Sequence, residues 1–296
     1  MSEAVKPSIA FVIMVRNEQL NLAACLESLR SLDAEVFVID SGSTDRSQEI
    51  AHEYGATILE HPFQSYAAQI NWAFDHIPTK ASWIFRLDAD EFLTPDLQAE
   101  LLEKLPTLGA NVTGIILKRR YYFLGRWIRH GGMYPLWHIR LFRRGAGRCE
   151  ERSMDEHIVV SEGETVKFNF DFVDNNLKGL GLWTEKHNSY SSLEVLDLVR
   201  GGSSPASHSN LSAQARRKRW GKETIYARSP RFLRAFLYWF VRYFVLLGFL
   251  DGREGLIFHF LQAFWYRFLV DAKLYEKERR WPGRGQGDDA DRAGLR

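Results

Sequence analysis

Short apolar runs alternate with amphipathic stretches along the first 118 residues of the chain. The apolar runs are rich in Val, Ile and Phe, so they predict β-strands at 9–15, 35–40, 56–60, 83–87 and 112–118. The stretches between them predict helices at 18–32 and 66–76, one that Ser43 or Thr44 caps and Gly55 ends, and one that opens at Pro95. This alternation predicts an α/β fold with a mostly parallel sheet and helices on both faces.

The pattern changes beyond residue 118. Residues 119–178 combine short strands with glycine pairs, arginines and aromatic residues, and we expect them to complete the domain that begins at residue 8. Residues 179–280 have helical character, whereas 281–296 hold too few apolar side chains to fold and predict a disordered tail. The sequence thus predicts a domain at 8–178 in two parts, 8–118 and 119–178, followed by a helical region and a tail.

Two segments of the helical region, 230–250 and 254–277, are crowded with Phe, Trp, Tyr and Leu. The first is nearly long enough to cross a bilayer, but Arg234 and Arg242 interrupt it. Its arginines share one face of a helix and leave a broad aromatic face. This pattern is typical of a helix that lies in the plane of a membrane interface. A hairpin packed on the α/β domain and an oligomer interface are the alternatives.

Charge is unevenly distributed, although the net charge is only +2. Residues 213–296 hold 18 of the 39 Lys and Arg but only 9 of the 37 Asp and Glu, and 216–219 reads RRKR. A basic end suits nucleic acid or an anionic membrane surface, while the RRKR run also fits a solvated helix face. The aromatic residues favour the membrane, because they lie in apolar helices rather than on an exposed stacking surface. We expect a membrane surface and no nucleic acid as partner.

Two further features concern the compartment. The cysteines, Cys25 and Cys149, supply no disulfide framework and suit a reducing environment. The first residues form a short apolar run that continues into charge, so we expect no signal peptide. These features predict a location in the cytoplasm or, peripherally, on the cytoplasmic face of the inner membrane. The sequence does not indicate an oligomeric state.

The most informative motif follows the predicted strand at 83–87, where the chain reads Asp88-Ala89-Asp90-Glu91. Three carboxylates within four residues repel one another unless a cation lies among them, and Mg²⁺ and Mn²⁺ prefer such oxygen ligands. Asp88 and Asp90 are two residues apart, so we expect them to point to one side and share the ion. A solvated acidic loop is the alternative.

Asp40 ends the predicted strand at 35–40 and precedes Ser-Gly-Ser-Thr-Asp. A carboxylate above such a turn can accept hydrogen bonds from a nucleobase or a ribose; the alternative is a turn with a helix cap. In parallel α/β sheets, ligands bind beyond the carboxyl ends of the strands. Because Asp40 and Asp88 both lie there, we expect them to belong to one site.

Several stretches together resemble the family 2 glycosyltransferases, which have the GT-A nucleotide-sugar fold. They are IAFVIMVRNEQLNLAACLESL, VFVIDSGSTDRSQEIAHEYGA, AQINWAF, LDADEFLTP, YFLGRWIRHGG, RLFRRG and the MDEH block. The chain is most similar to the bacterial subgroup related to lipopolysaccharide-core and exopolysaccharide transferases. The resemblance covers about 8–175 and continues loosely to about 278. It implies a nucleotide-binding part at 8–118 and an acceptor-side part at 119–178.

The resemblance implies roles for matching residues. The donor, a nucleotide-diphosphate sugar, would be bound by Val15, Asn17, Glu18, Asp40, Gln69, Asn71 and Asp88, with Asp40 on the base. Asp90 and Asp88 would ligate the divalent cation, Mg²⁺ or Mn²⁺, that neutralises the leaving diphosphate. Arg86 receives no role beyond pairing with a carboxylate.

On the acceptor side, Met154-Asp155-Glu156-His157 supplies candidates for the base that deprotonates an acceptor hydroxyl. The family's usual form is His-Glu, whereas here His157 follows Glu156, so the base is Glu156, which we favour, or Asp155. His157 is a candidate metal or diphosphate ligand, or a structural residue. Arginines and aromatic residues at 119–144 suit sugars and phosphates, and the loop that begins at His130 is our candidate donor-contact loop.

The sequence therefore predicts an inverting, metal-dependent glycosyltransferase. The acceptor would be a cell-surface glycan or glycolipid, for example a lipid-linked oligosaccharide. One alternative is a transferase that uses polyprenyl phosphate, which is already ionised and needs no base. The other is a non-catalytic, membrane-bound nucleotide-sugar-binding scaffold, which would not need the acidic set of Asp40, Asp88, Asp90 and Glu156.

Overall fold

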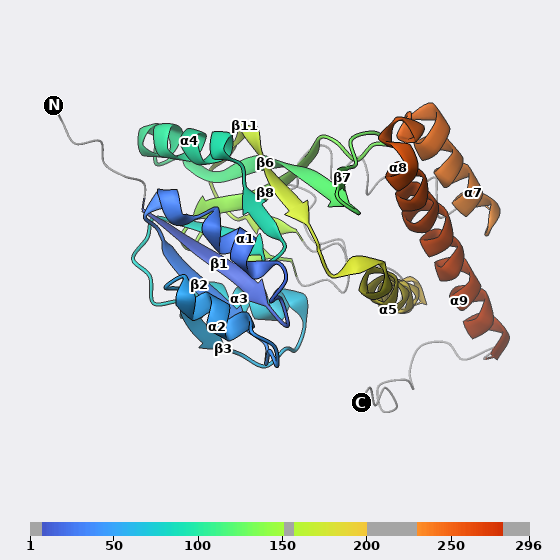
Figure 1. Ribbon diagram of the computed structural model, residues 1–296, viewed down its shortest axis with the longest axis horizontal. Coiled ribbons are helices and arrows are strands. Elements are labelled where there is room, and N and C mark those ends of the chain that lie inside the picture. The colour runs from blue at the N-terminus through green and yellow to red at the C-terminus, as the bar shows by residue number, and fades with distance from the viewer. Residues whose placement is uncertain (1–7, 151–156, 200–229, 281–296) are drawn as a thin grey trace.

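The computed structural model describes residues 8–150, 157–199 and 230–280 (Figure 1). Its centre is a nine-stranded sheet in the order β3-β2-β1-β4-β8-β6-β11-β5, with β7 paired to β6, beside a two-stranded ribbon of β9 and β10. The strands are β1 (Ile9–Val15), β2 (Glu35–Asp40), β3 (Thr57–Glu60), β4 (Trp83–Asp88), β5 (Glu91–Leu93), β6 (Val112–Phe123), β7 (Arg126–Trp127), β8 (Leu136–Arg143), β9 (Gly147–Cys149), β10 (Ile158–Val160) and β11 (Glu164–Asn175).

The predicted α/β class is confirmed, but the sheet is mixed rather than mostly parallel. β3, β2, β1 and β4 are parallel neighbours, as the helical crossovers between them require. β6 and β11 are also parallel, whereas β5, β7 and β8 run antiparallel to their neighbours. Leu124 and Gly125, both with positive φ, connect β6 to β7, and so short a turn imposes an antiparallel hairpin.

Helices cover both faces of the sheet, as predicted. Alternate residues of β1 belong to two different cores: Ile9, Phe11 and Ile13 lie on one side, and Ala10 and Val12 on the other. The first core is closed by α1 (Leu22–Glu27), α2 (Ser47–Glu53) and α4 (Pro95–Lys104), and the second by α3 (Tyr66–His76) and the β9–β10 ribbon. The short 3₁₀ helices η1 (Arg30–Leu32) and η2 (Leu105–Thr107) follow α1 and α4.

Local signals explain some of the helix ends and fail at others. Pro95 opens α4 as predicted, and the Thr94 side chain accepts the Leu97 N–H as its cap. Gly55, at φ +72°, follows the end of α2. The expected cap by Ser43 or Thr44 is wrong, because α2 begins only at Ser47. The predicted helix at 18–32 is likewise reduced to α1 and η1.

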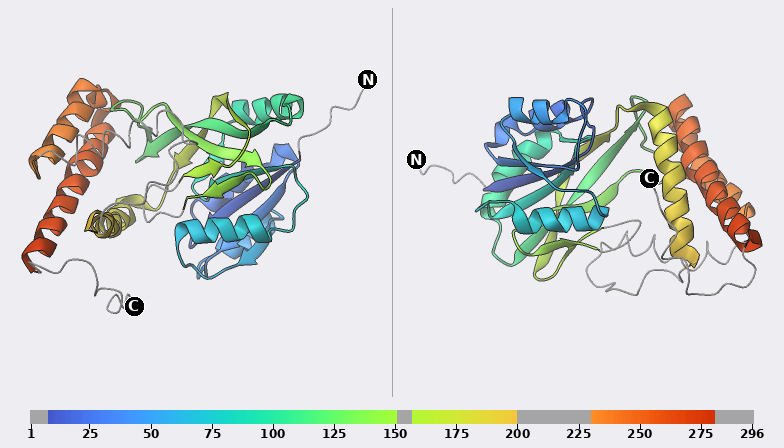
Figure 2. Two further views of the ribbon diagram at one scale, coloured as in Figure 1. Left: turned by 180° about the vertical axis from the view of Figure 1, so that it is seen from behind. Right: turned by 90° about the horizontal axis from the view of Figure 1, so that it is seen from below.

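The described parts of the chain beyond β11 are helical and stand beside the sheet (Figures 1 and 2). α5 and α9 run side by side and share a small core of Val195, Tyr266 and Val270 (Figure 2). The expected tail at 281–296 and the RRKR run lie outside the described residues. The elements are α5 (Gly179–Val199), α7 (Leu233–Phe240), η5 (Val241–Val245), η6 (Gly248–Asp251), α8 (Gly252–His259), η7 (Phe260–Trp265) and α9 (Tyr266–Arg280).

The loop between β7 and β8 docks this helical region onto the sheet domain. Buried Asp251 accepts the backbone N–H groups of Arg129 and His130 at 3.1 and 2.8 Å, and its other oxygen lies 2.6 Å from His130 Nδ1. Arg242 Nε donates to the Gly131 carbonyl at 2.8 Å. His259 is fully buried against Gly131, and burial lowers the pKa of this histidine to about 4. In the structure, this loop therefore contacts the C-terminal helices.

α7 and η5 form one continuous helix, Leu233–Val245, with its charged face inside and its aromatic face outside. Arg234 Nε lies 3.0 Å from both carboxylate oxygens of buried Asp271, and Arg242 is buried as well. Phe236, Phe240 and Phe244 are 45%, 43% and 44% exposed. Among the described helices, none is by itself long and apolar enough to cross a bilayer; one pair, Leu233–Val245 with Gly248–Arg279, meets that requirement jointly but is bent by 71°.

We predict that the docked loop does not tolerate a side chain at Gly131. Gly131 has φ +65°, and a Cβ there would lie 2.1 Å from His259 Cε1, whereas Gly125, at φ +80°, has no atom within 4 Å of such a Cβ. Gly125→Ala should cost only backbone strain, about 1 kcal/mol of unfolding free energy, and Gly131→Ala about 3 kcal/mol. Urea unfolding of both variants checks this; equal losses would contradict it.

Candidate active site

Three loops meet at one edge of the sheet because β1 lies between β2 and β4. Val15 pairs with Asp40 across β1 and β2, and Met14 pairs with Asp88 across β1 and β4. The predicted placement of Asp40 and Asp88 at the same edge is confirmed. This edge lies at the carboxyl ends of parallel strands, where α/β proteins bind ligands.

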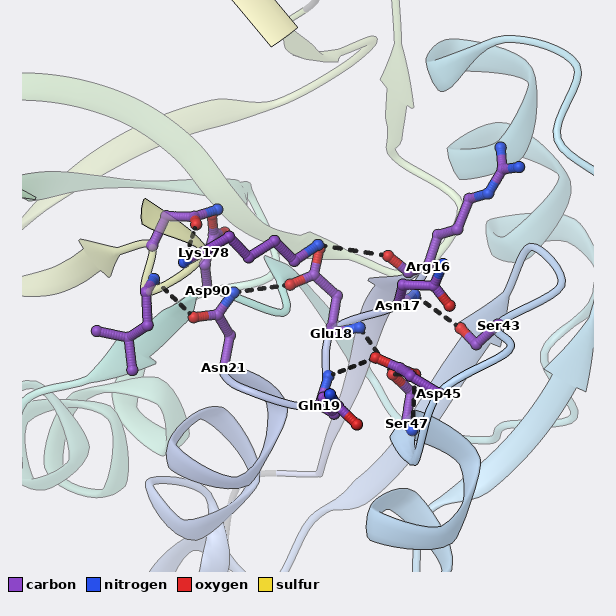
Figure 3. Close-up of polar contacts among 12 residues, drawn as sticks. Arg16, Asn17, Glu18, Gln19, Asn21, Ser43, Asp45, Ser47, Asp90 and Lys178 are labelled. Carbon is purple, nitrogen blue, oxygen red and sulfur yellow. Dashed lines mark hydrogen bonds and ion pairs between the residues drawn. The ribbon is translucent and has the colours of Figure 1, made fainter. Parts of the chain in front are cut away.

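The loops after β1 and β2 are joined by hydrogen bonds (Figure 3). Asn17 N–H donates to Ser43 Oγ at 2.9 Å, and Thr44 N–H donates back to Asn17 Oδ1 at 2.8 Å. Glu18 N–H donates to Ser47 Oγ at 2.7 Å. Asn17 adopts φ +54°, a conformation in which Asn is favoured among residues with a side chain. Ser43 and Thr44 are thus engaged with the β1 loop, which explains why neither caps α2.

The Asp40 carboxylate stabilises the turn after β2 through hydrogen bonds to residues of that turn and of α2. Its side chain is fully buried; Oδ1 accepts from Ser43 N–H at 2.9 Å and from Ser43 Oγ at 2.8 Å, and Oδ2 accepts from Gln48 Nε2 at 2.5 Å. The carboxylate therefore holds the loop in shape, and its contact with a base stays a prediction. Gln69 of α3 reaches the same edge, since its Nε2 donates to Ser41 Oγ at 3.0 Å.

Asn71 is not brought to this edge. Its amide donates to the Cys149 carbonyl at 3.0 Å and accepts the Cys149 N–H at 2.9 Å, so it fixes α3 to β9. His130 is also held elsewhere, by Asp251 of the helical region. The structure thus gathers Val15, Asn17, Glu18, Asp40, Gln69 and Asp88, but neither Asn71 nor His130.

Two buried arginines support the carboxylates that follow β4. Arg86 donates to Asp88 at 2.5 Å, which confirms the expected pairing of Arg86 with a carboxylate, and the Tyr66 hydroxyl also donates to Asp88. Arg140 of β8 pairs with Glu91, which is buried. Both arginines lie beneath the turn and neutralise charges that would otherwise repel one another. Glu91 therefore has a structural role.

Asp90 is the carboxylate best suited to a metal ion. Its Oδ2 accepts from Asn176 Nδ2 at 2.8 Å, and no hydrogen bond reaches Oδ1 from the part of the chain that the structure describes. Because β4 ends at Asp88, the alternation of a strand does not extend to Asp90. Mg²⁺ is commonly held by one or two carboxylates together with water and substrate phosphates, and Asp90 fits that arrangement.

The structure does not bring the expected metal ligands, Asp88, Asp90 and His157, together as a cluster. Across the described ranges, no three His, Cys, Asp or Glu side chains are arranged to hold an ion. His157 lies beside His138, with ring centroids 6.4 Å apart. Asp155 and Glu156 fall outside the described residues, although the residues that flank them are joined by a bond from Glu150 N–H to the His157 carbonyl at 3.0 Å.

The end of β11 adds residues that the sequence analysis overlooked. Asp174 pairs with Arg119 at 3.3 Å; burial, together with the charges of Asp90 and Asp88, raises the pKa of Asp174 to about 7. Asn176 and Lys178 follow and contact Asp90 and Glu18. The signal was present as VDNNLK, polar residues directly after an apolar strand, which is the same pattern as LDADE.

These features are accompanied by a family match. The chain matches glycosyl transferase family 2 over residues 10–158, half of its length, and belongs to that family. It is therefore a glycosyltransferase, and its α/β domain has the GT-A fold of the family.

Relatives with named roles come from polysaccharide synthesis. The lipopolysaccharide core biosynthesis glycosyltransferase LpsC of Rhizobium meliloti is 27% identical over 92% of this chain and 93% of its own. The succinoglycan biosynthesis protein ExoA of the same organism is 25% identical over 52% of this chain and 57% of its own. These similarities agree with the predicted lipopolysaccharide and exopolysaccharide subgroup.

Solved structures show a more distant similarity. The glucosyl-3-phosphoglycerate synthase of Mycobacterium tuberculosis, solved with Mn²⁺, UDP and glucosyl-3-phosphoglycerate, is 21% identical. The similarity covers 39% of this chain and 44% of that enzyme, with a TM-score of 0.30. The chain therefore spans less than half the length of that enzyme.

We predict that the Arg140–Glu91 pair stabilises the site only as a pair. Arg140→Met leaves Glu91 buried beside Asp88 without its partner and should cost about 3–5 kcal/mol of unfolding free energy. The double variant Arg140→Met, Glu91→Leu removes both charges and should recover at least half of that loss. Urea unfolding of the three proteins measures the coupling. A double variant no more stable than Arg140→Met would contradict the prediction.

Proposed function

We propose that the protein is an inverting, metal-dependent glycosyltransferase that uses a nucleotide-diphosphate sugar. The acceptor would be a cell-surface glycan or a lipid-linked oligosaccharide. The observation that carries the proposal is the shared edge of β1, β2 and β4, where the joined loops around Asn17 and Ser43 lie beside Asp90 and its open oxygen. Family membership and the similarity to LpsC support the reaction class and the kind of acceptor.

The chemistry follows from these residues. Asp90 would hold the divalent cation, which, when bound, neutralises the charge on the departing diphosphate. Asp88 is fixed by Arg86 and Tyr66, so it stays ordered beside the donor. Glu156 or Asp155 takes the proton of the acceptor hydroxyl. At the same time the hydroxyl oxygen bonds to the anomeric carbon of the sugar, and the bond from that carbon to the diphosphate oxygen breaks. Attack opposite the leaving group inverts the anomeric configuration.

The first experiment is nucleotide release from UDP-, GDP- and dTDP-sugars with and without Mn²⁺. We predict slow metal-dependent hydrolysis of one donor, reduced about 100-fold in Asp90→Asn because the cation loses its carboxylate. Asp96→Asn, an exposed position on α4, is the matched control and should behave as wild type. If no donor is bound or hydrolysed in a metal-dependent way, the proposed transferase chemistry fails.

The same assay with acceptors separates the two kinds of transfer. Transfer to a hydroxyl group needs a general base, so Glu156→Gln or Asp155→Asn should reduce it by roughly 10²–10⁴-fold. Transfer to polyprenyl phosphate would persist in both variants, and a retained anomeric configuration in the product would exclude the inverting mechanism.

The helix formed by α7 and η5 supports a location at a membrane surface, which we propose to be the cytoplasmic face of the inner membrane. Helices of soluble proteins usually turn their apolar side chains inward. In α7 the arrangement is reversed: Arg234 points inward to Asp271, and Phe236 and Phe240 are exposed. Further exposed apolar side chains lie on α7 and η5 and continue over η6 and α8. So wide an apolar surface is uncommon on a soluble monomer. The exposed residues include Leu233, Leu237, Val241, Val245, Leu246, Leu247, Phe249, Leu250, Leu256, Ile257 and Phe260. A bilayer interface would cover these side chains while the arginines stay paired within the protein.

We predict that the protein floats with vesicles of phosphatidylethanolamine and phosphatidylglycerol. The triple change Phe236→Ser, Phe240→Ser, Phe244→Ser should weaken binding roughly 100-fold, because each ring contributes about 1 kcal/mol. A matched control changes three exposed apolar residues of the sheet domain, Phe63, Leu124 and Phe170, to Ser. If the triple variant still floats, or if it turns a lipid-free oligomer into a monomer without affecting flotation, the membrane assignment is wrong.

A further inference from the structure

A short segment between β11 and α5, residues 175–178, bridges two of the loops at the site. Asn175 N–H donates to the Asp90 carbonyl at 2.9 Å, and Asn176 Nδ2 donates to the Asp90 carboxylate at 2.8 Å. Leu177 N–H donates to Asn21 Oδ1 at 2.9 Å, beside the β1 loop. This 175–178 segment therefore links Asp90 to the loop that carries Asn17 and Glu18.

Lys178 is the charged residue of this segment. Its Nζ lies 2.6 Å from Glu18 Oε1 and 3.5 Å from the Arg16 carbonyl oxygen (Figure 3). A lysine ammonium has three N–H donors, so one remains after these two contacts. The side chain is 21% exposed, whereas the guanidinium groups of Arg86 and Arg140 are buried beneath the turn. Lys178 is therefore a partly exposed ammonium group with one N–H donor left for a further contact.

Lys178 lies between the β1 loop and Asp90, because its segment is bonded to both. A nucleotide sugar with its base at the β1 and β2 loops and its diphosphate on a cation at Asp90 must pass between Glu18 and Asp90. Residues 175–178 lie there, held to both sides. Hydrogen bonds from a cation to phosphate oxygens are stronger than those between neutral groups.

A second lysine on α5 adds positive charge near these carboxylates. Lys186 lies within α5, and its Nζ lies 5.6 Å from the centre of the Tyr190 ring. Burial alone would lower the pKa of Lys186, but Tyr190 and the charges of Asp90 and Asp88 raise it above the ordinary value. Lys186 therefore stays charged at neutral pH and adds positive charge to the surroundings of Asp88 and Asp90.

We propose that Lys178 binds the diphosphate of the nucleotide-sugar donor and that Asn176 orients Asp90 for the accompanying cation. This inference rests on the proposed function and adds two residues to it. The ammonium exchanges part of its contact with Glu18 for a phosphate oxygen, while Asn176 keeps one oxygen of Asp90 occupied and directs the other to the cation.

The competing explanation is that Lys178 only braces the β1 loop through Glu18. A brace would act in the free protein, so its loss would lower the free energy of unfolding and would weaken ligands without phosphate as well. A phosphate ligand acts only when a diphosphate is bound. The two roles therefore differ in the stability of the free protein and in their dependence on phosphate.

The test measures binding of UDP and GDP, each with Mn²⁺, by titration calorimetry, and binding of uridine and guanosine by ligand-observed NMR. The proteins are wild type, Lys178→Met, Lys178→Arg and the control Lys80→Met, which changes an exposed lysine before β4, at the other end of that strand. We expect Lys178→Met to weaken diphosphate binding roughly 10- to 100-fold, with nucleoside binding and the urea midpoint unchanged. Lys178→Arg should recover at least half of the loss on a logarithmic scale, and Lys80→Met should match wild type.

Asn176 has its own readout. Asn176→Ala removes the hydrogen bond that holds the Asp90 carboxylate and should raise the Mn²⁺ concentration needed for diphosphate binding by about tenfold, whereas Asn176→Ser keeps a donor and should have a smaller effect. An unchanged Mn²⁺ requirement in Asn176→Ala would remove the orienting role.

The outcomes separate this inference from the proposed function. If wild type binds neither UDP nor GDP with Mn²⁺, the proposed function fails and the role of Lys178 fails with it. If wild type binds one of them and Lys178→Met binds it equally well, only the role of Lys178 is overturned. If Lys178→Met lowers the urea midpoint and Lys178→Arg does not recover diphosphate binding, Lys178 only stabilises the β1 loop and its role in diphosphate binding is overturned.

Discussion

The charge of the turn that follows β4 constrains everything around it. Asp88 ends the central strand β4, Asp90 lies in the turn, and buried Glu91 begins β5. Arg86 from β4 and Arg140 from β8 neutralise two of these carboxylates from beneath. Buried charges persist only when they are paired in this way. The pairing leaves Asp90 as the carboxylate that an ion can use, so the chemistry of the site depends on which acids are already satisfied.

The same principle explains the organisation of the loops. Buried Asp40 is satisfied by its own turn, and that turn is bonded to the β1 loop through Asn17. Residues 175–178 then join the β1 loop to Asp90. Three loops that are far apart in sequence thus become one hydrogen-bonded unit, which would hold the base and the diphosphate of the proposed donor at a fixed separation.

The C-terminal helices have a different property: polar contacts fill part of their interior, and apolar side chains cover much of their exposed surface. Asp271 binds Arg234, and Asp251 binds the loop that begins at His130, so these charged groups lie inside the region. Aromatic side chains such as Phe236 and Phe240 lie on its exposed side. In water this arrangement leaves a large unfavourable area, whereas in a bilayer interface it is favourable. The docking of this region on the loop after β7 couples the sheet domain to whatever covers that surface.

The sequence by itself determined the α/β class, the strands and the edge that carries Asp40 and Asp88, because strand periodicity and parallel crossovers are local properties of the chain. It also marked the family, through motifs that lie along single segments. Only the tertiary structure decided which polar residues are engaged in holding elements together, as Asn71 and His130 are, and which keep an atom without a hydrogen bond from the described residues, as Asp90 does at Oδ1. That distinction depends on hydrogen-bond partners more than 70 residues away, such as Cys149 for Asn71 and Asp251 for His130, and no local pattern encodes it.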